Sequence, residues 1–132
     1  MVLTPTYYVF DMYKVHEEAK LLPIKLVSPD YVSGSDHIPA VNASASKDSI
    51  GSIHISLVNI DPSKTIIVHS SFAGTKWTQI KDSILTSENF NDYNSFENPN
   101  KIKVAKFLNA KKENGELIVN LPPKSLVVLE LI

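Results

Sequence analysis

The chain has 132 residues, of which 43% are hydrophobic, and thirteen lysines against fourteen acidic residues give it a formal net charge of -1. This composition predicts one globular domain with its own core and argues against intrinsic disorder. Nucleic-acid binding needs clustered basic residues, and a membrane span needs roughly 18 uninterrupted apolar residues. The chain has neither pattern, and it has no cysteine for thiol chemistry.

Residues 4–20 are the stretch most typical of a long helix. Thr4 can cap the first backbone N–H groups, and Pro5 suits the first helical position, where its missing N–H would have no partner. The apolar side chains cover more of the circumference than a helix on one small sheet needs. They include Tyr8, Val9, Phe10, Met12, Tyr13 and Val15. We therefore expect this helix to be covered on more than one side.

The N-terminus has no charged region followed by an apolar core, so it does not look like a secretory leader. A helix that begins within a few residues of Met1 is unusual, and we expect the sequence to be cut from a longer protein. The compartment stays open between the cytoplasm, the periplasm and the exterior.

After the helix, short segments with alternating or β-branched apolar residues predict strands. These segments are 21–27, 41–46, 53–58, 65–70, 76–80, 83–86, 101–107, 117–121 and 125–131. Residues 28–40 predict an irregular crossing, and Asn114-Gly115 predicts a hairpin turn within a loop of more than two residues. Turn signals recur roughly every 8–12 residues, as in a two-sheet sandwich. The predicted fold class is mainly β, an antiparallel β-sandwich preceded by one N-terminal α-helix.

The histidines are the first candidates for a metal site. A hairpin folded about Asp61-Pro62 would place His54 and His69 opposite each other, with side chains on the same face. A zinc site needs three or four ligands, and the diagonal neighbours are Ser, Ile and Val, so we interpret the pair as solvent-facing. His16 and His37 lie in no metal-binding motif and are also predicted at the surface. We expect no metal and no cofactor.

Carboxylates give no catalytic pair. Glu88, Asp92 and Glu97 share one loop, and the adjacent Glu17 and Glu18 would point apart on a helix, whereas a glycosidase holds two acids on rigid elements. There is no G-x-S-x-G elbow and no glycine-rich phosphate loop. We therefore assign no catalytic residue.

The loop of residues 87–99 is the best candidate for ligand binding. Phe90, Tyr93 and Phe96 alternate with Asn and Asp, and aromatic rings beside amides and carboxylates are what a sugar-binding surface uses. Trp77 would be a further candidate ring. The alternative, which we favour, is that the three loop rings plug the end of the sandwich and order the loop.

Four stretches together resemble one family. Residues 3–13, 56–62, 94–99 and 121–129 are similar, in that order, to the carboxy-terminal part of family 51 α-L-arabinofuranosidases. Position 95 is Ser where Thr is expected. The resemblance implies a sandwich of jelly-roll type that follows a (β/α)₈ barrel. It also implies a parent enzyme that releases terminal arabinofuranosyl groups from arabinan and arabinoxylan by a retaining mechanism, with two glutamates on the barrel. No residue here matches either glutamate motif.

The resemblance divides the chain into residues 1–20, similar to the last helix of the missing barrel, and residues 21–132, the sandwich. The implied partners are the barrel of the same polypeptide and its arabinose-containing substrate, together with homo-oligomer contacts. Candidates for the interdomain interface are Tyr8, Phe10, Met12 and Tyr13. Alone, the chain is expected to be inactive and structural. The alternatives are a free-standing carbohydrate-binding module and a protein-binding module.

Overall fold

The computed structural model describes residues 3–22, 30–70, 77, 79–86, 92–106, 110–113 and 116–132. The helical segment comprises α1 (Pro5–Tyr13) and the 3-10 turn η1 (Lys14–His16). The strands are β1 (Lys20–Leu22), β2 (Asp30–Ser33), β3 (Asp36–Pro39), β4 (Val41–Lys47), β5 (Ile53–Asn59), β6 (Ile66–Ser70), β7 (Ile80–Thr86), β8 (Ala105–Lys106), β9 (Ala110–Glu113), β10 (Glu116–Leu121) and β11 (Ser125–Leu131). Among these residues, no helix has the length and apolar character needed to cross a membrane.

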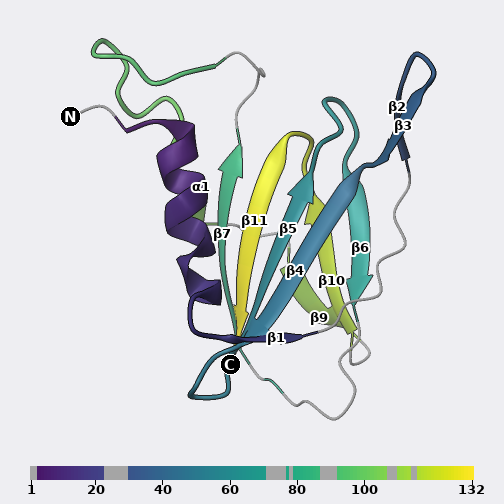
Figure 1. Cartoon of the computed structure of the whole chain (residues 1–132), viewed down its shortest axis with the longest axis vertical. Helices are drawn as coiled ribbons and strands as arrows, with labels where there is room; N and C mark the ends of the chain where they lie inside the picture. Colours follow the sequence, from purple (N-terminus) through teal and green to yellow (C-terminus); the bar gives the residue numbers. More distant parts are fainter. Residues whose placement is uncertain are drawn as a thin grey trace.

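In the part of the chain that the structure describes, the strands form three antiparallel sheets. A six-stranded sheet, here the large sheet, has the order β1-β4-β5-β11-β7-β8, and a three-stranded small sheet has the order β6-β10-β9. The strands β2 and β3 pair separately as a hairpin. The large and small sheets lie face to face, with α1 on the other side of the large sheet (Figure 1). The predicted antiparallel sandwich with one N-terminal helix is confirmed.

The large sheet is covered on both faces, which explains the nearly continuous apolar sequence of β11. On its inner face, Val127 and Leu129 pack with Leu117 and Val119 of the small sheet in the main core. On its outer face, Leu126 and Val128 pack against the helical segment in a second cluster. A strand buried on both faces cannot use alternating polar residues, so β11 is apolar at nearly every position.

The helix is shorter than residues 4–20. Thr4 caps it as predicted, because its side chain accepts a hydrogen bond from the Tyr7 backbone N–H at 3.2 Å. The helix gives way to η1 after Tyr13, and Glu18 has a positive φ of 56° that turns the chain back toward the sheet. Lys20 consequently begins β1 rather than ending the helix.

The predicted hairpin about Asp61-Pro62 is wrong, because β5 and β6 belong to different sheets. Asn59 and Asp61 stabilise this crossing. The Asn59 amide Nδ2 lies 3.0 Å from the Lys64 carbonyl and 3.2 Å from the Leu121 carbonyl, while Asp61 Oδ1 accepts the backbone N–H groups of Ser63 and Lys64, each at 2.9 Å. The chain therefore passes from one layer to the other instead of turning back on itself.

Several strand limits also differ from the sequence prediction. Of residues 101–107, only Ala105–Lys106 form a strand among those described. Glu113 pairs with Glu116, so β9 and β10 run closer to the predicted turn than expected. Asn114 and Gly115 themselves lie outside the described residues. Residues 28–40 are not wholly irregular, because they contain the β2–β3 hairpin, in which Gly34 has the positive φ of 63° that glycine tolerates.

Candidate functional site

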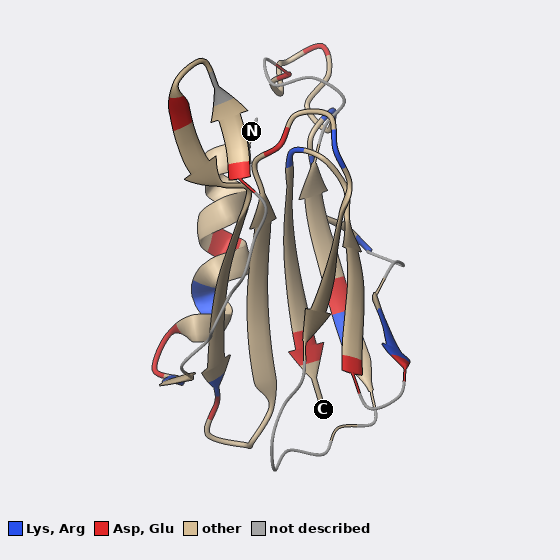
Figure 2. Ribbon diagram, turned by 90° about the vertical axis from the view of Figure 1, so that its right-hand side faces the viewer, with Lys and Arg blue, Asp and Glu red and all other residues tan. Residues whose placement is uncertain are grey.

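The exposed apolar side chains near α1 form the first candidate surface. Phe10 is 73% exposed, and Tyr7 and Val9 of the same helix are also exposed. Asp11 is the charged residue within α1, and its carboxylate pairs with Lys14 at 3.2 Å. Most of the helix is therefore tan in Figure 2. Of the predicted interface candidates, Met12 is buried against the large sheet and Tyr8 and Tyr13 are half-buried, whereas Phe10 faces outward. The four candidates therefore occupy both sides of the helix.

The segment of residues 92–104 extends this surface. Asn94 Nδ2 donates to the Leu3 carbonyl at 2.7 Å and to the Ile102 carbonyl at 2.8 Å, and its Oδ1 accepts the Ile102 N–H. These bonds hold the segment, green in Figure 1, beside the N-terminal end of α1. Ile102 is buried, whereas Tyr93 is 70% and Phe96 is 88% exposed.

The plug interpretation of the loop aromatics is therefore wrong for Tyr93 and Phe96. The loop is anchored instead by Asn94 and Ile102, which satisfy backbone groups and fill the space under the helix. Phe90 lies outside the described residues. Trp77 is buried in the main core, at 5% exposure, and is not available as a sugar-stacking ring.

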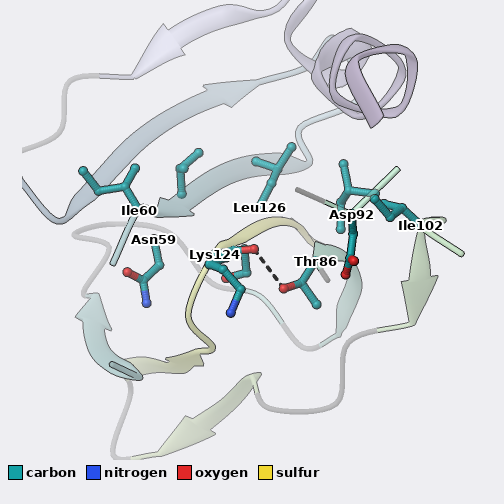
Figure 3. A pocket seen from close by; sticks show the side chains of 10 residues that line it. Asn59, Ile60, Thr86, Asp92, Ile102, Lys124 and Leu126 are labelled. Carbon is teal, nitrogen blue, oxygen red and sulfur yellow. Dashed lines mark hydrogen bonds between the residues drawn. The ribbon is translucent and has the colours of Figure 1, made fainter. Parts of the chain in front are cut away.

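A cavity of about 330 Å³ lies between this segment and one end of the large sheet (Figure 3). Among the described residues that line it, none is aromatic, and its polar groups already stabilise the fold. Thr86 Oγ1 donates to the Lys124 carbonyl at 2.8 Å, Lys124 Nζ donates to the Pro62 carbonyl, and the Asp92 carboxylate pairs with Lys101 at 3.0 Å. The cavity thus lacks both the rings and the available donors that sugar binding requires.

Two of the histidines predicted at the surface are buried or partly buried. The two ring nitrogens of His16 lie 2.5 Å from Ser46 Oγ and Ser56 Oγ, so this side chain bridges η1 to the large sheet. Burial, and secondly the nearby charge of His54, lowers the pKa of His16. His54 is itself 7% exposed, and its Nε2 lies 2.8 Å from Asp48 Oδ2. His69 is exposed on the small sheet, next to Glu116.

The fold brings together two carboxylates that sequence analysis did not connect, those of Asp48 and Glu130, each near His54. Hydrogen bonding to His54, and then to backbone N–H groups, lowers the pKa of Asp48. A catalytic general acid needs a raised pKa, so Asp48 is a poor proton donor. No local motif could reveal this trio, because it depends on the pairing of β5 with β11.

Known proteins resemble the chain along nearly its whole length. A family model described as the α-L-arabinofuranosidase C-terminal domain matches residues 1–125. An intracellular exo-α-L-arabinofuranosidase of Bacteroides ovatus is 47% identical over 132 residues, which are 99% of this chain and 26% of that protein.

Solved structures agree with this similarity. The GH51 arabinofuranosidase from Xanthomonas axonopodis pv. citri is 36% identical with a TM-score of 0.96, over 100% of this chain and 27% of that one. The GH51 α-L-arabinofuranosidase from Thermotoga petrophila is 22% identical with a TM-score of 0.82, over 99% of this chain and 29% of that one, and supports the fold alone. The chain thus spans about a quarter of the length of the relatives it matches.

Proposed function

The chain belongs to the family of α-L-arabinofuranosidase C-terminal domains, and we propose that it is the accessory sandwich of such an enzyme, with a structural role. The observation that carries this role is the apolar surface of Phe10 and Phe96, which no described part of the chain covers. In a folded parent this surface packs against the catalytic (β/α)₈ barrel of the same polypeptide and stabilises it.

Residues 1–20 then correspond to the last barrel helix and residues 21–132 to the sandwich. This division gives the two sides of α1 different partners, because Met12 packs on the large sheet while Phe10 points away from it. A helix between two layers needs more apolar surface than one stripe. In this proposal, the apolar surface of α1 beyond a single stripe is an interdomain face. The same surface is also a candidate for homo-oligomer contacts.

The parent enzyme is proposed to hydrolyse terminal α-L-arabinofuranosyl residues of arabinan and arabinoxylan. A retaining mechanism needs two carboxyl groups on opposite sides of the scissile bond, one acting as nucleophile and one as acid and base. In this proposal both are barrel glutamates outside the chain. The lowered pKa of Asp48 and its three hydrogen bonds suit a fixed structural anion rather than an acid catalyst.

An assay of the purified chain tests this assignment. We expect no hydrolysis of an aryl α-L-arabinofuranoside by the chain alone, and hydrolysis by the complete polypeptide that carries it. Titration with arabino-oligosaccharides should show no binding to the chain. Hydrolysis that survives repurification of the chain would refute the structural role.

The alternative is a carbohydrate-binding module, favoured by the exposed rings of Tyr93 and Phe96. Such rings stack on sugars, and Asn98 lies in the same turn, where its backbone N–H binds Ser95 Oγ. Oligosaccharide binding that is lost in Phe96→Ala, with the fold retained, would establish this alternative. Binding that is unchanged in Phe96→Ala would exclude these rings as the site.

A further inference from the structure

A histidine and two carboxylates meet on the outer face of the large sheet. His54 shares the facing parity of Ser56, which contacts His16, and of Val58, which packs with the second cluster. Glu130 of β11 is the direct cross-strand partner of His54, and Asp48 lies in the turn between β4 and β5. One nitrogen or oxygen atom of each of the three side chains lies within 4.8 Å of the others.

The three side chains are held by rigid parts of the fold. His54 and Glu130 stand on neighbouring central strands of the large sheet. Asp48 Oδ1 accepts the backbone N–H groups of Ile50 at 3.1 Å and Ser52 at 2.9 Å, which leaves Oδ2 directed to His54. Binding sites are most precise when their groups are fixed in this way before the ligand arrives.

The imidazole of His54 is buried, yet only one of its two ring nitrogens has a hydrogen-bond partner among the described residues. Its side chain is 9% exposed, and among the described residues its Nδ1 has no hydrogen-bond partner. A buried polar atom without a partner costs free energy. The Asp48 and Glu130 side chains are half-buried, so solvent reaches the cluster from their side.

We propose that Asp48, His54 and Glu130 bind a divalent transition-metal ion, with Zn²⁺ as the best match. One imidazole and two carboxylates supply the mixed nitrogen and oxygen set that zinc accepts, and water completes the coordination. Metal–ligand distances of roughly 2.0–2.2 Å require the three side chains to move closer together. The half-buried Glu130 side chain can make that movement without a change in the backbone.

Lys81 offers a competing explanation for the position of Glu130. It is exposed on β7 and is the cross-strand partner of Glu130 on the side away from His54. If Lys81 held Glu130 in place, Glu130 would have its partner on β7 and the cluster would need no metal. If the cluster binds a metal ion, the Lys81 ammonium repels that ion. Removing the Lys81 charge should therefore strengthen metal binding.

Calorimetric titration of chelator-treated chain with Zn²⁺ tests the proposal. We expect one ion per chain and a rise in melting temperature on saturation. Glu130→Gln and Asp48→Asn should each weaken Zn²⁺ binding by about tenfold or more. Loss of a residue that only supports a metal ligand typically has an effect of about this size, and loss of a ligand itself should have at least the same effect. Lys81→Gln should strengthen binding. In Asp48→Asn, the amide oxygen of the new side chain can still accept hydrogen bonds from the backbone N–H groups of the turn. Loss of Zn²⁺ binding in this variant would therefore reflect the lost carboxylate rather than a disrupted turn.

Glu116→Gln is the matched control, because Glu116 contacts His69 at 3.3 Å in an exposed pair with no third ligand among the described residues. Its affinity for Zn²⁺ should equal that of the unmodified chain. Absence of saturable Zn²⁺ binding, or binding that survives Glu130→Gln and falls in Glu116→Gln, would overturn the proposal. Equal binding of Ca²⁺ would also overturn it, because calcium takes oxygen ligands and does not need His54.

Discussion

His16 connects the helical segment to the large sheet through one imidazole ring. A neutral imidazole has one donor and one acceptor nitrogen, and the hydroxyls of Ser46 and Ser56 can satisfy either role. No metal-binding motif surrounds His16 in the sequence, so the residue was predicted at the surface. The small Ser46 on β4 and Ser56 on β5 could have indicated this contact, because they leave room for a ring from another element.

The pH dependence of stability should reflect His16. Burial, and then the charge of His54, lowers its folded-state pKa below the ordinary value of 6.5, so the folded chain binds fewer protons than the unfolded chain. This contribution to stability is complete above pH 6.5 and is lost as the pH falls from there toward the folded-state pKa. Urea unfolding across this range should show decreasing stability, with a smaller decrease in His16→Gln.

An NMR titration of the His16 ring provides the direct check. Burial of the ring predicts a folded-state pKa below 6.5, and a measured pKa at or above that value would show that burial does not disfavour the charged ring. Asp48 and Asp61 do not interfere with the stability measurement in this pH range. Their pKa values are lowered from 3.8, so the stability they contribute is lost only as the pH falls below that value.

At the scale of elements, sequence patterns identified what each segment is better than what it pairs with. The alternation of Ile53, Ile55 and Leu57 was enough to predict β5, and Thr4 with Pro5 was enough to predict the start of α1. The change of sheet after β5 depends on contacts of Asn59 with carbonyl groups far along the chain. Such contacts leave no periodic trace in the sequence.

The two sides of α1 should respond differently to truncation. Met12 is 6% exposed in the second cluster, so Met12→Ala should reduce the free energy of unfolding of the chain by about 2–5 kcal/mol. Phe10 is 73% exposed, and Phe10→Ala should change it by no more than about 0.5 kcal/mol. Urea denaturation of both variants measures the difference, and similar losses would show that α1 is oriented differently on the sheet.

At the scale of the whole molecule, the described sandwich and its outer helix form a three-layer domain that leaves apolar side chains exposed near α1, including Phe10 and Phe96. The sequence predicted the architecture and the excess apolar surface of α1. It did not predict that the segment carrying Phe96 would lie beside the same helix, because that depends on the bonds between Asn94 and Leu3. Nor did it predict the Asp48–His54–Glu130 cluster, whose members come together only through the sheet.

The most direct test of the interdomain role compares Phe10→Ser with Phe96→Ser in the isolated chain and in the complete arabinofuranosidase. Ile67→Ser, on the exposed side of β6 at 60% exposure, is the control. Burial of a Phe side chain contributes about 1.5–3 kcal/mol, and the complete relative is about four times as long as this chain. Each Phe variant should therefore lower the melting temperature of the complete enzyme by roughly 1–3 °C. It should leave the isolated chain and the control unchanged. Equal effects in the chain and the complete enzyme, or none in either, would contradict the account.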